Sequence, residues 1–276
     1  MNLMECIVQN KMKKSNIGII LLSSLSMAVL PANASLISSW NLNGDYSDST
    51  GNGHAGAGFG SNFLADSPSN SNLQSANFNN SSYVALNQSF SGVGSLSEFS
   101  ASAWFKTTAT DNNWSLLDFD RSDFFNMVVT GRGGIAFSTS TGIIHDMVSL
   151  KTGLNDGNWH HVAVTYGAAT GKTIYIDGAA DSSTSYNGAL GTFRTRFGFI
   201  GDGSEASSFN GKRNGLYYDG LISEVKLWDE SISEQAVSAQ AVSAQAVRAK
   251  VPEPSTLAIF ALGMIGLASR RLKKQS

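Results

Sequence analysis

The chain has 276 residues, 42% of them hydrophobic and 14% charged, a length that allows one large β domain with a sizeable core. The single cysteine, Cys6, excludes a disulfide within the chain. Seven of the 19 basic and two of the 21 acidic residues fall in the terminal segments described below. The remaining body, 35–250, therefore has a net charge of −7, which argues against nucleic acid as a partner.

The N-terminal segment, 1–34, has the layout of a secretory signal peptide. Three lysines precede an apolar run over 17–30, and Ala32-Asn33-Ala34 forms a small-x-small cleavage site for signal peptidase. Cleavage after Ala34 leaves Ser35 as the first residue of an exported protein. The lysines are Lys11, Lys13 and Lys14.

Two details of this segment follow from the same pattern. Met1 and Met12 both remain candidates for the true start, because the residues before Met12 add nothing that a signal peptide needs. No lipobox surrounds Cys6, so a lipoprotein is not expected, and the mature chain has no thiol.

The body over 35–234 is divided every 8–12 residues by Gly, Asn, Asp and Ser, with short apolar or alternating runs between them. This pattern predicts an all-β sandwich. In Ser100–Phe105, Ala101, Ala103 and Phe105 share one face of a strand, and the serines and Trp104 share the other. Asp177-Gly178 predicts a two-residue hairpin turn.

Three groups of motifs in the body resemble the laminin G-like, concanavalin A-like jelly roll of bacterial surface proteins. The first is the opening strand with its D-x-T-G-N-G-x-x-G loop, where the family usually has serine in place of Thr50. The second is W-H-x-V-A-x-T-Y followed by Y-x-D-G. The third is the closing strand, with Ser223-Glu224 where Asp-Glu is usual. Their residues are 40–45 with 48–56, 156–166 with 174–178, and 199–202 with 218–228.

The resemblance implies an antiparallel, two-sheet jelly-roll sandwich over nearly the whole mature body. It does not imply one function, because lectins, adhesion modules and hydrolases all use this fold.

Asp118-Phe119-Asp120-Arg121-Ser122-Asp123 is the strongest enzyme-like signal, since its D-x-D-x-x-D spacing resembles the catalytic strand of laminarinase-type glycoside hydrolases. A retaining mechanism needs two carboxyl groups about 5–5.5 Å apart. Here all three acids are the shorter Asp, and Arg121-Ser122 is typical of a turn. The interpretation is a polar turn, so no catalytic residue is assigned.

Two other motifs are also interpreted as structural. Gly167–Thr173 imitates a phosphate loop but is one residue short and leads into a strand, so it predicts a hairpin. His160 and His161 are adjacent, so on a strand they face opposite sides and do not chelate one metal together.

A calcium site is the more reasonable metal hypothesis. Asp45, Asp48 and Asn52 place oxygen atoms in a glycine-rich loop where backbone carbonyls could complete a cation shell. The alternative is an Asx-type turn in which Asp48 accepts hydrogen bonds from its own backbone. Both remain open at this point.

Carbohydrate binding needs aromatic rings exposed beside polar side chains. Trp40, Trp159 and Trp228 lie within the family motifs and are predicted to be core residues. Trp114 and Tyr217-Tyr218 lie at junctions of loops and strands and are the predicted ligand-facing residues.

Residues 235–250 contain a tandem repeat, Q-A-V-S-A, Q-A-V-S-A, Q-A-V-R-A. A five-residue period matches neither 3.6 nor 2, so it does not keep one apolar face buried for long. The segment is predicted to be a linker, frayed and helical at most, that leads away from the domain.

The C-terminal segment, 251–276, joins a Pro252-Glu253-Pro254 box to a short apolar helix and a basic cluster. It resembles the PEP-CTERM signal that exosortases process. The resemblance implies transient insertion in the inner membrane, cleavage near the box and delivery to the cell surface or extracellular matrix. An ordinary anchor or a buried core helix is the alternative. The basic residues, expected on the cytoplasmic side, are Arg270, Arg271, Lys273 and Lys274.

Together these features predict an exported, non-catalytic jelly-roll protein that binds a polysaccharide or another surface protein, with one calcium ion as the candidate cofactor. A purely structural matrix component is the first alternative, and a glycoside hydrolase or lyase is the second.

Overall fold

The computed structural model describes residues 35–110, 113–167, 170–186 and 188–250. The predicted signal peptide (1–34) and the sorting segment with its hydrophobic helix (251–276) lie outside these residues. Within the described ranges, no helix has the length and hydrophobicity needed to cross a membrane.

The described residues form fifteen β-strands and one α-helix. The elements are β1 (Leu36–Trp40), β2 (Gly56–Phe59), β3 (Asn62–Leu64), β4 (Ser75–Asn79), β5 (Tyr83–Ser91), β6 (Glu98–Lys106), β7 (Trp114–Asp118), β8 (Phe125–Val129), β9 (Ile135–Ser140), β10 (Ile144–Val148), β11 (His160–Gly167), β12 (Gly171–Ile176), β13 (Ala179–Thr184), β14 (Thr195–Ile200), β15 (Asp219–Trp228) and α1 (Glu234–Lys250).

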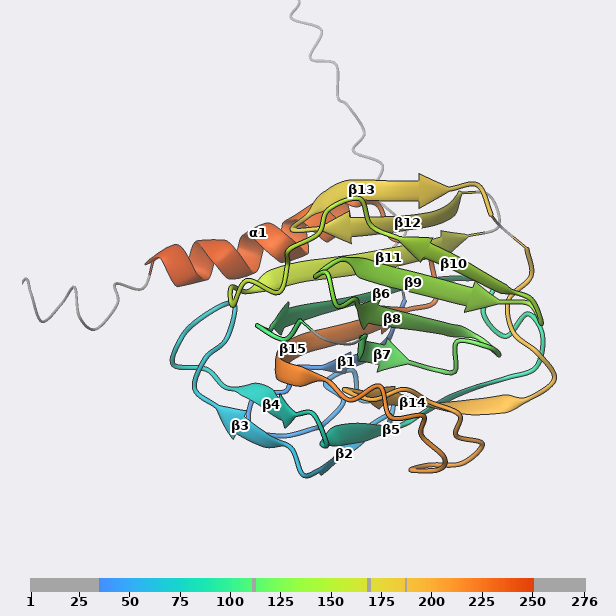
Figure 1. Ribbon diagram of the computed structural model, residues 1–276, viewed down its shortest axis with the longest axis horizontal. Helices are drawn as coiled ribbons and strands as arrows, with labels where there is room; N and C mark the ends of the chain where they lie inside the picture. Colours follow the sequence, from blue (N-terminus) through green and yellow to red (C-terminus); the bar gives the residue numbers. More distant parts are fainter. Residues whose placement is uncertain (1–34, 111–112, 168–169, 187, 251–276) are drawn as a thin grey trace, which may run out of the picture. The chain divides into compact units, whose positions relative to one another are not determined.

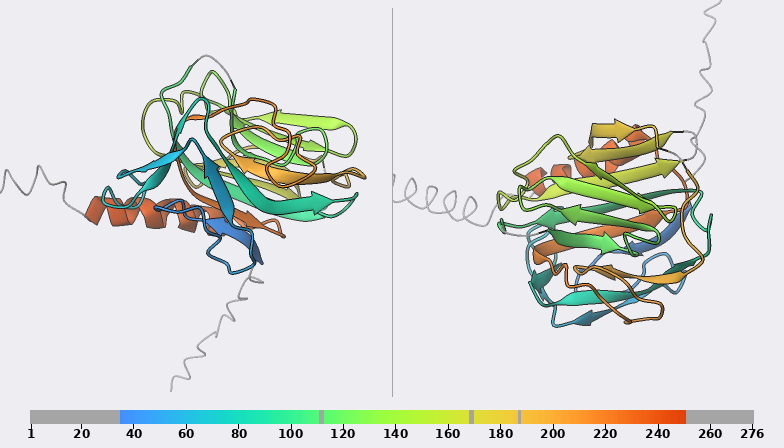
Figure 2. Two further views of the ribbon diagram at one scale, coloured as in Figure 1. Left: turned by 90° about the horizontal axis from the view of Figure 1, so that it is seen from below. Right: turned by 45° about the vertical axis from the view of Figure 1, so that its right-hand side comes forward.

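The strands make two antiparallel sheets that pack face to face (Figures 1 and 2). One sheet has the order β13-β12-β11-β6-β15-β4-β3, with β1 also paired to β15, and the other has the order β10-β9-β8-β7-β14-β5-β2. Neighbouring strands in each sheet are often distant in sequence, which is typical of jelly rolls. The predicted all-β, two-sheet sandwich is therefore confirmed.

Side-chain alternation explains the central strands. Along β6, Ala101, Ala103 and Phe105 are buried between the sheets, while Trp104 packs on the outer side, as the sequence predicts. The hairpin from β12 to β13 is also confirmed, because Asp177 and Gly178 both have positive φ, 53° and 87°.

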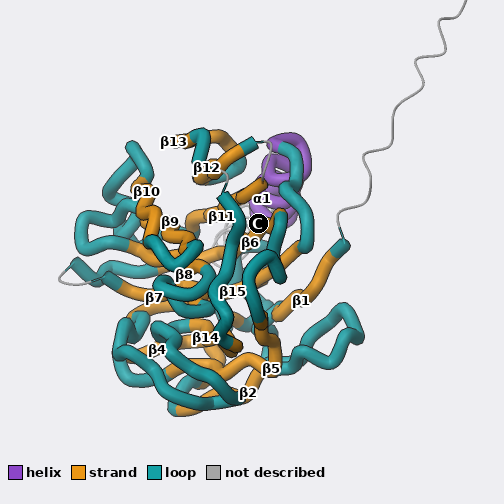
Figure 3. The backbone as a smooth tube through the Cα atoms, turned by 90° about the vertical axis from the view of Figure 1, so that its right-hand side faces the viewer, coloured by secondary structure: helices purple, strands orange, loops and turns teal. Residues whose placement is uncertain are grey.

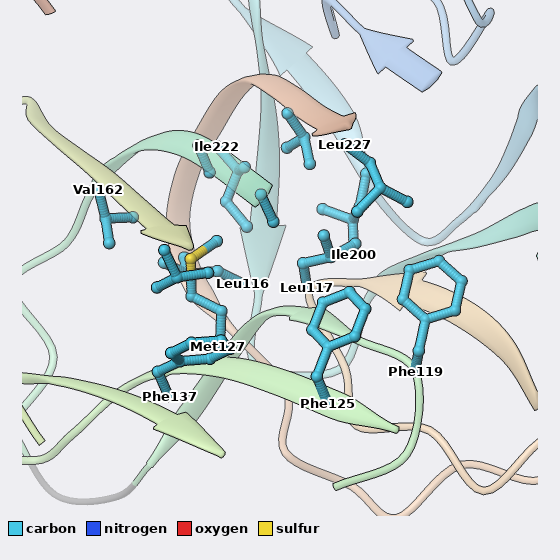
Figure 4. Packing of buried hydrophobic residues seen from close by; sticks show 14 of the residues in the cluster. Leu116, Leu117, Phe119, Phe125, Met127, Phe137, Val162, Ile200, Ile222 and Leu227 are labelled. Carbon is cyan, nitrogen blue, oxygen red and sulfur yellow. The ribbon is translucent and has the colours of Figure 1, made fainter. Parts of the chain in front are cut away.

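The core between the sheets is rich in phenylalanine and branched aliphatic residues (Figure 4). Phe99 and Phe125 lie at the centre, with ring centroids 4.3 Å apart, and Phe119 packs 5.3 Å from Phe125. Fully burying one such side chain stabilises the fold by about 1.5–3 kcal/mol. Because the mature chain has no disulfide, this core is the main source of its stability.

The last strand, β15, departs from simple alternation. Its pairing with β6 shifts between Ser223 and Lys226, and Glu224 has a φ of 50°. This bulge lets both Ile222 and Val225 face the core, although they are three residues apart. Strict alternation would instead have placed Leu221 on the same face as Val225.

The tandem repeat forms α1, which packs on the outer side of the eight-stranded sheet near β11, β12 and β6 (Figure 3). Val237 is fully buried with Ala163, Tyr175 and Trp228, and Ala241 is buried against Trp104. The expectation that this segment only leads away from the domain is therefore wrong for its first two turns.

The packing of these two turns also bears on where the three tryptophans that were predicted to be core residues lie. Trp40 lies in the core between the sheets, as predicted. Trp228 and Trp159 instead belong to clusters under α1, on the outer side of the sheet. The repeat supplies the small residues that cover them, which sequence periodicity alone did not reveal.

Candidate ligand-binding groove

A groove of about 460 Å³ lies on the outer face of the seven-stranded sheet, opposite the side that faces the core. The alternation of side chains along β8 explains which residues line this groove. Phe125, Met127 and Val129 are buried in the core, so Asn126 and Val128 point outward.

Strand register brings polar side chains of four strands into one row. Asp118 of β7 pairs with Asn126 of β8, which pairs with Ser138 of β9, which pairs with Asp146 of β10. Four strands at the usual spacing make this row about 14 Å long.

A second row, two residues along each strand, is apolar. Val128 of β8 pairs with Ala136 of β9, which pairs with Val148 of β10. All three line the groove, and Leu216 also contributes to its lining. The groove thus sets a line of polar groups beside a line of aliphatic ones.

Arg121 and Asp146 form an ion pair in the groove. Arg121 donates from Nε to Asp146 Oδ1 at 3.0 Å, and its Nη2 donates to Oδ2. The hydrogen bond from Arg121 lowers the pKa of Asp146, and a hydrogen bond from Ser138 lowers it further. Both charged side chains are about half exposed, so part of their hydrogen-bonding capacity faces solvent.

Asn126 is the deepest polar group of the groove. Its Nδ2 donates to Asp118 Oδ2 at 3.2 Å, while its Oδ1 has no hydrogen-bond partner among the described residues, although Asn126 is only 2% exposed. A buried carbonyl oxygen without a partner costs free energy, but less than 1 Å² of this oxygen is accessible, so a ligand hydroxyl reaches it only if neighbouring side chains shift.

Asp118 lies behind Asn126 and is fully buried. Burial raises the pKa of Asp118 to about 8, against the hydrogen bond that Asp120 N–H donates to it at 2.7 Å. The carboxyl group is thus mainly protonated at neutral pH, and it supports Asn126 rather than contacting solvent.

The remaining acids of the D-x-D-x-x-D motif serve the turn between β7 and β8. Arg196 Nε lies 2.6 Å from Asp120 Oδ2 and 2.6 Å from Asp123 Oδ2, and all three residues are buried. Asp120 has a φ of 70°, so the chain reverses there. The predicted polar turn is confirmed, with an internal ion cluster that the sequence did not indicate.

Two of the predicted ligand-facing aromatic residues are buried. Trp114 is 2% exposed and belongs to the core, and Tyr218 is fully buried against Phe78, with ring centroids 6.0 Å apart. The prediction that these two rings face a ligand is therefore wrong. Both adjoin polar loops in the sequence, but Trp114 is the first residue of β7 and Tyr218 directly precedes β15, and tertiary packing buries both rings.

Tyr217 is partly exposed and packs against the outer face of the sheet. The Arg213 guanidinium lies 3.7 Å from the Tyr83 ring centroid and 5.8 Å from that of Tyr217, and Phe59 stacks on Tyr83 at 4.9 Å. These contacts hold the loop that carries Leu216 against the sheet, so Tyr217 helps to fix one wall of the groove.

Asp48, one of the residues predicted to bind calcium, is held by hydrogen bonds within the protein. Both oxygens of Asp48 accept hydrogen bonds, from Ser39 N, from Thr50 N and Oγ1, and from His54 N, at 2.8–3.2 Å. Burial raises the pKa of Asp48, but these donors outweigh it and lower the value. The alternative, an Asx-type turn, matches this geometry.

The other two members of that set also form hydrogen bonds within the protein. Asp45 accepts from Ser47 N and Oγ, and Asn52 Nδ2 donates to the carbonyl of Ile37 at 2.9 Å. Among the described residues, no group of three or more His, Cys, Asp or Glu side chains is arranged to hold a metal.

The two histidines face opposite sides, as predicted. His160 lies between Asp177 and Asp156, with its ring nitrogens 3.1 and 3.2 Å from their carboxylates. Burial lowers the pKa of His160, but hydrogen bonds to both aspartates outweigh it and raise the value. His161 is buried beside Trp104, so neither ring belongs to the groove.

Comparisons with family models give two matches. Residues 78–238 match the concanavalin A-like lectin/glucanases superfamily, and residues 250–274 match the PEP-CTERM protein-sorting motif. The first match covers more than half of the chain, and the second begins at the last residue of α1. No curated protein matches the chain.

Several solved structures share the fold at low sequence identity. Domain 4 of AbnA, a GH43 extracellular arabinanase from Geobacillus stearothermophilus solved with arabinotriose, is 17% identical, with a TM-score of 0.57. The match covers 75% of this chain and 98% of that domain.

Toxin domains also match. The binding domain of Paraclostridial Mosquitocidal Protein 1 is 14% identical, with a TM-score of 0.58, and covers 75% of this chain and 52% of that one. The receptor-binding domain of botulinum neurotoxin type G is 15% identical, with a TM-score of 0.55. The match covers 76% of this chain and 51% of that domain. This chain spans about half the length of these toxin domains. Such identities show a shared fold and nothing more specific.

Proposed function

Because the chain belongs to the concanavalin A-like lectin/glucanases superfamily and carries a PEP-CTERM sorting motif, we propose that it is an exported surface protein whose groove binds a neutral glycan without cleaving it. The sorting motif accounts for export and exosortase-dependent surface localisation. The polar row beside the apolar row in the groove is the observation that carries the glycan proposal.

A sugar ring suits these two rows. Arg121 supplies N–H donors and Asp146 supplies acceptors, and both side chains are about half exposed. A pair of neighbouring hydroxyls can donate to Asp146 and accept from Arg121 at the same time. The aliphatic row of Val128 and Ala136 offers a surface for the C–H face of the ring.

Electrostatics favours a neutral ligand. The charges of Arg121 and Asp146 cancel, and no other charged side chain lines the groove among the described residues. The body as a whole has a net charge of −7, which repels a polyanion at low ionic strength. Neutral polysaccharide is therefore a better match than an acidic one.

The groove also lacks the groups that glycoside hydrolysis requires. Two carboxyl groups on opposite sides of the scissile bond are needed, one of them protonated. Asp146 is the single carboxylate among the described lining residues, and its pairing with Arg121 keeps it ionised. Burial raises the pKa of Asp118 to about 8, but this residue has no exposed surface. This geometry supports binding without catalysis.

A protein partner is the second candidate, and a different surface favours it. Phe193 is 95% exposed and Ile143 is 70% exposed. Their loops meet at one end of the sandwich, where Gly191 N donates to Ser140 O at 3.0 Å. Exposed apolar side chains of this size are common at contact surfaces between proteins.

The test is binding of purified residues 35–250 to a panel of neutral and acidic glycans, including exopolysaccharide of the producing cell. We expect saturable binding to a neutral glycan and no release of reducing ends. Asp146→Ala should weaken binding about tenfold or more, since it removes a charged hydrogen-bond partner. Asp229→Ala, at an exposed carboxylate after β15 in the other sheet, is the matched control.

Absence of binding to every glycan would contradict the proposal and favour the protein-contact or purely structural alternatives. Equal loss in Asp146→Ala and Asp229→Ala would place the ligand outside the groove. Release of reducing ends that stops in Asp118→Asn would restore the hydrolase interpretation.

A further inference from the structure

Helix α1 starts as an integral part of the folded body. Ser233 caps its N-terminus, because its Oγ accepts a hydrogen bond from Ala236 N at 3.3 Å. Val237 and Ala241, one helical turn apart, are 0% and 1% exposed. Between them, Gln240 Oε1 accepts from Ser102 Oγ of β6 at 3.3 Å.

The same part of the helix packs against the hairpin between β12 and β13. A Cβ added to Gly178 would lie 3.0 Å from Ala241 Cβ and 3.2 Å from Ser238 Cα. Such a close approach leaves no room for the helix to slide or tilt at this point. The first two turns are therefore fixed to the body.

The five-residue repeat then turns the helix surface away from the sheet. Each repeat advances the helix by about 500°, so equivalent residues of successive repeats differ by about 140° in direction. The structure shows this directly, because Val237 is fully buried and Val242, the same residue of the next repeat, is 57% exposed. Among the described side chains, contact with the body ends at Ala241.

The helix itself continues to Lys250, nine residues beyond Ala241. At 1.5 Å per residue, this portion of the helix is about 14 Å long. The Pro252-Glu253-Pro254 box follows at once, and proline does not continue a helix. The fixed turns supply the helix nucleus, which is the costly step for a short isolated helix.

We propose that α1 is a rigid spacer that sets the distance between the folded body and the Pro-Glu-Pro box presented to a membrane-bound processing enzyme. A flexible segment of nine residues would let the body approach the membrane and cover the box. A helix anchored at Val237 and Ala241 does not shorten in this way. Each Q-A-V-S-A repeat adds about 7.5 Å to the spacer.

The test is deletion of residues 243–247, one repeat length, from the full chain in cells that carry the exosortase. The deletion leaves every described contact of α1 with the body intact. We expect the C-terminally cleaved fraction, measured by immunoblot, to fall severalfold, while N-terminal signal cleavage is unchanged. Replacing 243–247 by Glu-Ala-Ala-Ala-Lys, a helix of equal length, is the control and should be cleaved like the unaltered chain.

A second variant separates the rigidity of the helix from the number of residues. Replacing 243–247 by Gly-Ser-Gly-Ser-Gly keeps the chain length but breaks the helix, so we expect the cleaved fraction to fall as it does in the shortened chain. Normal cleavage of the shortened chain would overturn the proposal. Normal cleavage of the Gly-Ser variant, or a loss that the equal-length helix also shows, would overturn it as well.

Discussion

At the residue scale, Asp118 couples the groove to the pH dependence of stability. Its pKa is about 8 in the fold because of burial, against an ordinary value of 3.8. The folded state therefore holds this proton more tightly than the unfolded chain does. The stability from Asp118 is complete below pH 3.8 and decreases as the pH rises to about 8.

Asp118→Asn should remove this dependence, because an amide stays neutral throughout this pH range. We expect the variant to have a higher melting temperature than the unaltered protein at pH 8 and a flatter profile between pH 4 and 8. Asp229→Asn, at an exposed position, is the control. An unchanged slope in Asp118→Asn would contradict the assignment of a protonated carboxyl group.

Arg196 provides a second residue-scale prediction. Arg196→Met leaves Asp120 and Asp123 buried without their cationic partner, which should cost about 3–5 kcal/mol of unfolding free energy. Lys212→Met removes the exposed pair with Glu205 and should cost less than about 1 kcal/mol. Urea denaturation measures both. Similar losses in the two variants would show that the buried cluster contributes no more than a surface pair.

At the element scale, the repeat contains its own control for the docking of α1. Val237→Asp buries a carboxylate among Tyr175, Trp228 and Ala163, and we expect a loss of several kcal/mol in unfolding free energy. Val242→Asp, at the equivalent position of the next repeat, should change it by less than about 0.5 kcal/mol. Equal effects in the two variants would mean that α1 does not pack on the sheet in solution.

Local chemistry made some elements predictable from sequence. Asp177-Gly178 specifies a hairpin because both residues tolerate positive φ, and the alternation along β6 specifies which side chains enter the core. The bulge at Glu224 was not predictable, since it depends on pairing with β6, more than a hundred residues away. The docking of α1 was missed because it rests on two small residues in a repeat without helical period.

The groove was missed for a related reason. Asn126, Ser138 and Asp146 come from three strands, and only their register places them in one row. The search for exposed aromatic rings selected Trp114 and Tyr218, which tertiary packing buries. The sequence of β8 did contain one indication of the groove. Asn126 is the single polar residue in an otherwise apolar strand, and it lies on the face opposite the core.

At the scale of the whole molecule, the structure predicts stability that is independent of calcium. The Asp48 carboxylate is already satisfied by donors from its own loop and from β1. We expect calcium chloride and EDTA to give the same melting temperature for residues 35–250. A rise of several degrees with calcium, lost in Asp48→Asn, would show instead that the loop rearranges to bind the ion.

The most direct test of the central claim fills the groove without altering its polar groups. Ala136 lies in the middle of the apolar row, and Ala136→Trp places a large ring in the groove. The account predicts that titration calorimetry shows no binding of the preferred neutral glycan to this variant, at an unchanged melting temperature. Ala180→Trp, at an exposed position of β13, should bind normally. Equal affinity of Ala136→Trp and the unaltered protein would contradict the groove as the binding site.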